Sequence, residues 1–227
     1  MKTTRLRWKE SVRIVGAEHG PIDALERVTS PDDLDDVLAF EALTTPAAAA
    51  LRERVARIPS RQRVVGPGST DAMAPFLHFS APGGRFSDGT YGVYYAARDR
   101  DTAIAETCFH RERLLREFAA PSQTVAMRVL LAALDVQVQD LRGSSDTSII
   151  DPDPARYASA QALGARLRAA GVNGVAYDSV RQPGGECAAL FSPGAVGKVH
   201  RAERLNYEWS ASRNRIVTVS HVVQERT

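Results

Sequence analysis

Hydrophobic residues recur with two different spacings along the chain, and each spacing predicts a different kind of element. Spacings of three and four residues are typical of amphipathic helices, and they predict helices over 30–42, 45–58, 102–118 and 157–170. Alternating or short continuous apolar runs are typical of strands, and they predict strands over 12–15, 91–96, 124–131, 134–141, 172–177, 187–191 and 215–219. Helices and short strands alternate irregularly and without an internal repeat, so the pattern favours a compact α+β fold.

Residue types at the element boundaries refine this pattern. Ser30 followed by Pro31 is typical of an N-cap and a first helical position. The helices predicted within 30–58 form a helical insertion behind the first strand. The glycine-containing segments 66–70 and 83–89 are interpreted as loops.

The composition is that of an ordinary globular protein. The chain has 227 residues, 44% of them hydrophobic and 25% charged, which fits one domain and excludes a disordered or coiled-coil chain. It contains no run of 18 uncharged apolar residues, and residues 1–10 lack the apolar core of a signal peptide. We therefore expect a cytoplasmic protein that does not span or bind a membrane.

Metal and thiol chemistry have little support in the sequence. Cys108 and Cys187 are far apart and form no CxxC pair, and the five histidines show no HxxxH or HExxH motif, so no metal site is expected. Cys108 follows Ile104 on a helical stripe and Cys187 lies in a predicted strand, so both thiols are expected in the core. A Ser-His-Asp hydrolase is not supported because the chain has no GxSxG motif.

The charge pattern leaves a nucleic-acid-binding module as an alternative. The net charge is +2, from 29 basic and 27 acidic residues, and lysine occurs only at positions 2, 9 and 198. The many arginines suit phosphate groups because each guanidinium can form two parallel hydrogen bonds. Acidic residues are interleaved throughout, which argues against a single basic face for nucleic acid. A phosphate-ester hydrolase is a further alternative, but the chain offers neither a metal site nor a nucleophile for it.

Two short segments carry residues suited to chemistry on a nucleotide. In the loop 83–89 (GGRFSDG), glycines let backbone N–H groups approach an anion and Arg85 adds a charged fork; a plain hairpin turn is the alternative. Tyr94 and Tyr95 end a predicted strand, and a tyrosine there can stack on a flat ring such as nicotinamide. Glu106 on the next helix can stabilise a cationic sugar centre. A core tyrosine and a solvated glutamate are the alternative interpretation.

Three polar residues in the second half are weaker candidates. Ser179 directly follows a predicted buried strand, where polar ligand contacts often lie. Ser159 and Gln161 open a predicted helix whose first turn suits a phosphate or a ribose. Ordinary capping and turn formation are the alternative for each of them.

The order of these segments resembles the RES domain family, which is named for its Arg, Glu and Ser residues. The matching segments are VRIV (12–15), GGRFSDG (83–89), GVYYAA (92–97), TAIAET (102–107), YASAQALG (157–164), GVAYDSVR (174–181) and ECAALF (186–191). The resemblance implies an ADP-ribosyltransferase-like α+β fold with small mixed or antiparallel sheets and flanking helices. It also implies a single RES-type domain over 1–227, with a core over 12–192, the helical insertion over about 30–58 and a C-terminal extension over 193–227.

The resemblance assigns a role to each candidate in the first half of the chain. Arg13 and Arg85 match the arginines that suit the NAD pyrophosphate. Tyr95 matches the ring beside nicotinamide, with Tyr94 as an adjacent alternative. Glu106 matches the catalytic glutamate, so Glu106, Arg85 and Tyr95 form the predicted catalytic set.

The resemblance leaves two assignments open. Ser159, Gln161 and Ser179 complete the predicted NAD-binding set, and Ser159 and Ser179 are both candidates for the family serine. The helical insertion increases the sequence separation between Arg13 and Arg85, so Arg61 or Arg63 could take the role of Arg13.

The resemblance also implies a function. RES proteins use NAD as a substrate without a metal, and they are the toxins of bacterial toxin–antitoxin pairs. Their partner is an Xre-like antitoxin whose C-terminal part covers the active site. Some members degrade NAD with water or phosphate, and others transfer ADP-ribose to a protein such as phosphoribosyl pyrophosphate synthetase. The added helices favour a protein acceptor and growth arrest by ADP-ribosylation, with NAD glycohydrolase or phosphorylase activity as the alternative and no direct contact with nucleic acid.

Overall fold

The computed structural model describes residues 2–18, 20, 22–79, 81 and 83–222. In this part of the chain the strands are β1 (Lys2–Gly16), β2 (Tyr94–Ala97), β3 (Gln123–Asp140), β4 (Gly174–Asp178), β5 (Glu186–Leu190), β6 (Val199–Ser210) and β7 (Arg215–His221). The helices are α1 (Asp23–Arg27), α2 (Pro31–Glu41), α3 (Pro46–Ala56), α4 (Ser69–Leu77), α5 (Arg100–Glu117) and α6 (Ala158–Ala169). Short 3-10 turns occur at Ser60–Gln62, Pro154–Arg156 and Pro193–Ala195.

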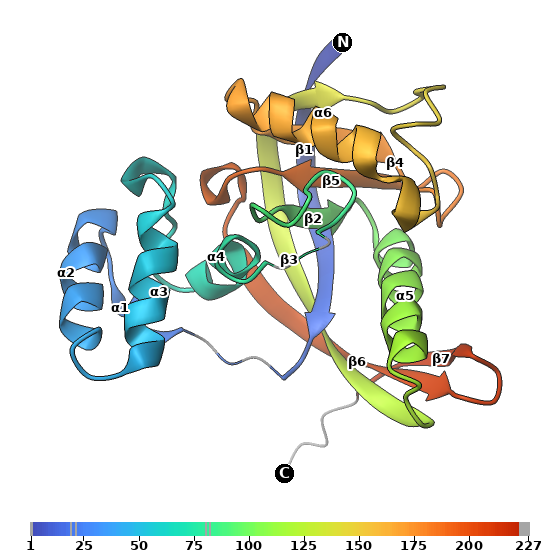
Figure 1. Ribbon diagram of the computed structural model, residues 1–227, viewed down its shortest axis with the longest axis horizontal. Helices are drawn as coiled ribbons and strands as arrows, with labels where there is room; N and C mark the ends of the chain where they lie inside the picture. The colour runs from blue at the N-terminus through green and yellow to red at the C-terminus, as the bar shows by residue number, and fades with distance from the viewer. Residues whose placement is uncertain (1, 19, 21, 80, 82, 223–227) are drawn as a thin grey trace.

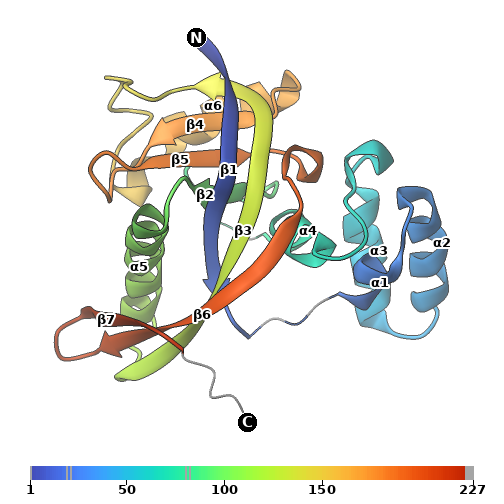
Figure 2. The same cartoon turned by 180° about the vertical axis from the view of Figure 1, so that it is seen from behind.

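The strands form one mixed sheet in the order β1-β2-β5-β4-β3-β6-β7. β3 and β4 are parallel, and the other neighbouring strands are antiparallel. β1 also pairs with β3, from Lys2↔Asp140 to Gly16↔Met127, so β1, β2, β5, β4 and β3 close into a ring. Figures 1 and 2 show β1 and β3 side by side, with β2, β5 and β4 running across them. The predicted α+β class with a mixed sheet and flanking helices is confirmed.

Alternate side chains of the strands supply two apolar cores on opposite faces. Tyr94 and Ala96 of β2 face the first core, to which β1, β3 and helices α1–α4 also contribute. Tyr95 and Ala97 face the second core, which fills the space between the sheet and helices α5 and α6. The residues with candidate chemistry gather beside this second core.

Two helices occur where the sequence pattern predicts them between residues 30 and 58. The Ser30 hydroxyl accepts a hydrogen bond from the Asp32 backbone N–H at 3.2 Å, and the Thr45 hydroxyl accepts one from Ala48 at 3.1 Å. Each cap is followed by a proline at the first helical position. Together with α1, these helices stand to one side of the sheet, away from α5 (Figure 1).

Helix α4 corrects the interpretation of 66–70 as a loop. The helix begins at Ser69, directly after Gly68, whose φ of 85° lies in the left-handed region that favours glycine. The glycines and the internal Pro75 are loop signals in the sequence, but burial outweighs them. Met73, Phe76 and Leu77 are buried in the first core, so packing stabilises a helix that local propensity disfavours.

Three strands also differ from expectation. The strand predicted over 12–15 extends over Lys2–Gly16 as β1. The segments predicted separately over 124–131 and 134–141 form one strand, β3, because β1 pairs with it on both sides of residue 133, at Ser11↔Ala132 and Trp8↔Leu134. Strand β6 was not predicted, since its first half (VHRAER) is charged. Its second half carried a usable signal, because Leu205, Tyr207 and Trp209 alternate and are buried.

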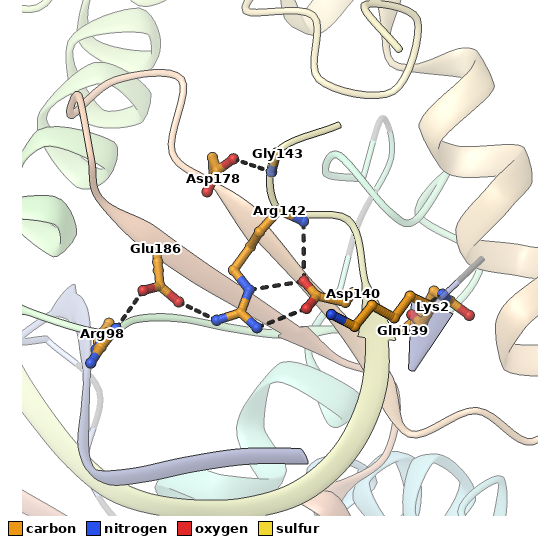
Figure 3. Close-up of polar contacts among 8 residues, drawn as sticks. All are labelled: Lys2, Arg98, Gln139, Asp140, Arg142, Gly143, Asp178 and Glu186. Atoms are coloured by element: carbon orange, nitrogen blue, oxygen red, sulfur yellow. Dashed lines mark hydrogen bonds and ion pairs between the residues drawn. The ribbon is translucent and has the colours of Figure 1, made fainter. Parts of the chain in front are cut away.

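A network of charged side chains ties the ends of β2, β3 and β5 together (Figure 3). Arg142 donates two hydrogen bonds of 2.8 Å to Asp140, from Nε to Oδ1 and from Nη2 to Oδ2. Its Nη1 donates to Glu186, which also pairs with Arg98. The bonds from Arg142 hold the pKa of Asp140 below its ordinary value and raise the pKa of Arg142.

Candidate active site

Segments far apart in the sequence surround a cavity of about 300 Å³ beside the second core. Arg13 of β1, Arg85 of the glycine loop, Tyr95 of β2 and Glu106 of α5 all line it. The sheet and α5 therefore bring together four of the residues that the sequence analysis singled out. Their catalytic and NAD-binding roles stay predictions.

Glu106 is held in place by a serine from the other half of the chain. The Ser179 hydroxyl donates to Glu106 Oε1 at 2.6 Å. The same hydroxyl oxygen accepts hydrogen bonds from the backbone N–H groups of Arg181 at 3.1 Å and Gln182 at 3.0 Å. Because these two donors occupy the oxygen lone pairs, the hydroxyl hydrogen is left for Glu106. The turn after β4 thus orients the carboxyl group of Glu106.

Arg85 is buried, with only 6% of its surface exposed. Its Nη1 donates to the backbone oxygens of Ile149 at 3.2 Å and Asp151 at 2.8 Å, and its Nη2 donates to the Tyr157 hydroxyl at 3.2 Å. A guanidinium has five N–H donors, so these three bonds leave the Nε hydrogen and one Nη2 hydrogen. Among the described residues, no carboxylate pairs with Arg85, although a buried charge is costly without a partner. The arrangement therefore offers a fork for an anion.

Two tyrosines that the sequence analysis missed enclose Arg85. The guanidinium carbon lies 4.4 Å from the ring centre of Tyr157 and 6.0 Å from that of Tyr177. Both tyrosines line the cavity. Tyr157 directly precedes α6. Tyr177 lies in β4, which the sequence analysis predicted only as a buried strand. The burial of Tyr177 raises the pKa of its hydroxyl.

The alternation of β2 separates the two adjacent tyrosines. Tyr95 lines the cavity, and its hydroxyl oxygen accepts a hydrogen bond from the Phe86 N–H at 2.9 Å. This bond attaches the glycine loop to β2, and burial raises the pKa of Tyr95. Tyr94 is fully buried on the opposite face, in the first core. Burial raises the pKa of Tyr94 to about 12.

Arg13 lies at the gap between β1 and β2. Its Nη1 donates to the Tyr95 backbone oxygen at 2.8 Å, and its guanidinium carbon lies 5.0 Å from the ring centre of Tyr94. Burial lowers the pKa of Arg13. Neither alternative arginine lines the cavity: Arg61 is exposed, and Arg63 Nη1 pairs with Asp35 at 2.7 Å.

Of the two candidate residues at the start of α6, Ser159 and Gln161, it is Gln161 that is hydrogen-bonded to the glycine loop. Gln161 Nε2 donates to the Gly84 backbone oxygen at 3.1 Å. The helix approaches the loop so closely that a Cβ at Gly164 would lie 2.2 Å from the Phe86 oxygen. Ser159 is exposed on α6 and does not line the cavity. Of the two serine candidates, Ser179 is therefore the one that contacts Glu106.

His110 is a further lining residue that the sequence analysis left out. It follows Glu106 by four residues on α5, so the two side chains share one helix face. Burial and the nearby charges of Arg113 and Arg181 lower the pKa of His110 to about 4. The helical spacing from Glu106 was the available signal in the sequence.

Both cysteines pack as the sequence predicts. Cys187 is buried in β5 against the second core, and Cys108 packs against the same core from α5. Burial raises the pKa of the Cys108 thiol to about 11 and raises that of Cys187 as well. Neither thiol is therefore activated as a nucleophile. Within the described residues, no group of three or more His, Cys, Asp or Glu side chains is placed to hold a metal ion.

Comparison with known proteins places this geometry in a family. The RES domain family model matches residues 54–210, a span that includes Arg85, Tyr95, Glu106 and Ser179 but not β1. A curated relative, the uncharacterized protein y4oC of Sinorhizobium fredii (strain NBRC 101917 / NGR234), is 23% identical over 213 residues, which cover 90% of this chain and 84% of the relative. The crystal structure of the M. tuberculosis MbcT-MbcA toxin-antitoxin complex aligns with a TM-score of 0.43 and 10% identity, over 92% of this chain and 89% of that chain. No helix in the described part of the chain is long and apolar enough to cross a membrane.

Proposed function

Because the chain belongs to the RES domain family, we propose that it is the toxin of a toxin–antitoxin pair that cleaves NAD at the nicotinamide–ribose bond. The ADP-ribose passes to a protein acceptor, and growth stops. Glu106, Arg85 and Tyr95 are the catalytic residues of this proposal. Arg13 lines the same cavity as these three. Ser179 and Gln161 do not line it, and they support the NAD site by holding Glu106 and the glycine loop. Ser159 is exposed away from the cavity, and we leave it out.

One observation carries the proposal: Arg85, whose buried guanidinium keeps two donors that no described residue uses, lines the same cavity as Glu106. A buried guanidinium with two donors to spare can hold an anion, and a pyrophosphate supplies oxygens at the spacing of the fork. Arg13 brings a second positive charge to the same cavity. Two arginines match the two negative charges of the NAD pyrophosphate.

Glu106 performs the step that breaks the bond. The bond between the nicotinamide nitrogen and C1′ of the ribose breaks, and its electron pair leaves with neutral nicotinamide. The positive charge that develops on the ribose is stabilised by the Glu106 carboxylate, which Ser179 holds in place. An acceptor oxygen or nitrogen then bonds to C1′ and releases one proton. The Tyr95 ring provides a flat apolar wall for the nicotinamide.

A protein acceptor is favoured over water or phosphate by the helices beside the sheet. Phe40 in α2 is 72% exposed and Leu43, two residues after the end of α2, is 84% exposed. Exposed apolar side chains that lie next to each other can form a contact surface for another protein. We propose that they contact the target, for which phosphoribosyl pyrophosphate synthetase is a candidate from the family. NAD glycohydrolase or phosphorylase activity is the alternative.

The proposal includes a partner that restrains the activity. A cytoplasmic enzyme that consumes NAD would damage its own cell, so an antitoxin must cover the cavity. The family points to an Xre-like protein as that antitoxin. Co-expression with the protein encoded next to this gene tests this part. A complex that releases nicotinamide as fast as the free chain would refute it.

The central experiment follows nicotinamide release from NAD in the presence of EDTA. The free chain should release nicotinamide, and a folded Glu106→Gln variant should not. NAD labelled in the adenosine half, incubated with cell lysate, then separates the acceptors: label on a protein supports transfer, and label only in free ADP-ribose or ADP-ribose 1-phosphate supports the alternative. If no acceptor yields nicotinamide, the enzymatic proposal is wrong.

A further inference from the structure

A second cavity, of about 470 Å³, lies against the other side of β1. Val15 and Leu130 line it from the strands, and Ile22 lines it from the segment that follows β1. Thr70, Asp71 and Pro75 line it from α4. Apolar lining thus comes from both the sheet and the helix, and the polar lining residues are Arg13, Thr70, Asp71, His78 and Arg128.

The two cavities meet at Arg13, which lines both of them. β1 and β2 pair only at Val12↔Ala97, so the edge of β1 beyond Val12 is not covered by β2. Arg13 reaches across this gap to the Tyr95 backbone oxygen. A ligand that extends past this uncovered edge touches Arg13 and enters both cavities.

The first cavity is small relative to the whole of NAD. Its volume of about 300 Å³ is at the lower end of the range of roughly 300–1,000 Å³ for small-molecule sites. That volume suits one nucleoside of NAD, whereas NAD has two, joined by the pyrophosphate. With the nicotinamide riboside beside Glu106 and the pyrophosphate at Arg13, the remaining nucleoside lies on the far side of β1.

The walls of the second cavity suit a flat base with a ribose. Val15 and Leu130 line it from the strands and Pro75 lines it from α4, and apolar lining from two elements suits a planar ring. Asp71 is fixed by Arg201, whose Nε donates to Oδ2 at 2.6 Å, and its carboxylate accepts hydrogen bonds from an amino group or a ribose hydroxyl. We propose that this cavity binds the adenosine half of NAD, a subsite that rests on the proposed function.

The first test fills the second cavity from α4. Ala74 lines the cavity, so Ala74→Phe should exclude the adenosine; Ala165→Phe, on the exposed face of α6, is the matched control. The readout is kcat/KM for NAD divided by kcat/KM for nicotinamide mononucleotide, which lacks the adenosine half. We expect this ratio to fall by about tenfold or more in Ala74→Phe and to stay at the wild-type value in the control. An unchanged ratio in folded Ala74→Phe would overturn the subsite.

The second test uses the unaltered chain, so it does not depend on a variant that folds. 8-Azido-NAD is irradiated on the protein, and the labelled peptides are identified by mass spectrometry. Label in β1 or α4 supports the subsite, and label confined to α5 or α6 overturns it. A chain that cleaves NAD but is labelled only at α5 or α6 refutes the subsite and leaves the proposed function standing. A chain that neither cleaves NAD nor takes up label refutes both.

Discussion

Replacing Arg85 with lysine tests whether the two spare donors of this buried guanidinium hold an anion. Lysine keeps the positive charge, but its ammonium cannot present two parallel N–H groups on a planar edge. The lost bond to a charged group costs roughly 1.5–3 kcal/mol of binding free energy. This corresponds to a Kd for ADP-ribose that rises about 10- to 150-fold.

The same substitution has a separate effect on folding, because Arg85 also satisfies the backbone oxygens of Ile149 and Asp151. Leaving these carbonyls without their donor costs about 1–3 kcal/mol in the free energy of unfolding. Calorimetry with ADP-ribose, which lacks the nicotinamide bond, measures binding without cleavage. Urea unfolding of the free chain measures the change in the free energy of unfolding independently.

Tyr157→Phe is the matched control for Arg85→Lys. It removes the hydroxyl that accepts from Arg85 Nη2 but keeps the ring beneath the guanidinium, so the fork stays intact. We expect a loss of stability of about 0.5–1.5 kcal/mol and an affinity for ADP-ribose close to that of the wild type. If folded Arg85→Lys binds ADP-ribose as tightly as the wild type, Arg85 holds no pyrophosphate and the glycine loop is a plain turn.

Four further predictions follow from the contacts at the site and in the charged network of Arg142. Expression of the chain should arrest growth, and Glu106→Gln should relieve the arrest. The variant should stay folded because its amide oxygen still accepts the hydrogen bond from Ser179. A folded variant that is still toxic would place the catalytic carboxylate elsewhere. Ser179→Ala should lower kcat about tenfold to a hundredfold with a smaller change in KM, since the hydroxyl orients Glu106 rather than NAD; an equal change in both constants, measured by steady-state nicotinamide release, would contradict this role. Arg142→Met should destabilise the chain by about 1.5–3 kcal/mol in urea unfolding. Arg142 holds the pKa of Asp140 below its ordinary value of 3.8, so the stability from this pair is present above pH 3.8 and is lost as the pH falls through the lower folded pKa. The Arg142→Met variant should therefore lose less stability than the wild type on acidification. An equal loss in both chains would refute the coupling between Arg142 and Asp140. The pKa of His110 is lowered to about 4, so the rate of nicotinamide release should have the same pH dependence near pH 6.5 in the wild type and in His110→Gln. An inflection near pH 6.5 that is present in the wild type and absent from His110→Gln would show that the imidazole titrates normally.

Local sequence patterns are sufficient to predict most of the elements around the site and the residue types that line it. The apolar alternation and the caps place β2, β4, β5, α5 and α6 within a few residues of their positions in the structure, because side-chain periodicity and capping are properties of neighbouring residues. The glycines around Arg85 and the position of Glu106 on the helix that follows the tyrosine strand are equally local. They were enough to indicate a site for an anion and a cationic sugar.

The tertiary structure decided which of several similar residues meet. Ser179 rather than Ser159 reaches Glu106, which is 73 positions away, and Tyr95 rather than Tyr94 faces the cavity because α5 and α6 cover that side of β2. Such contacts depend on the ring closing through β1 and β3, and local periodicity carries no information about that closure. Helix α4 followed the same rule: burial of its apolar side chains against the sheet outweighed the glycine and proline signals that favour a loop.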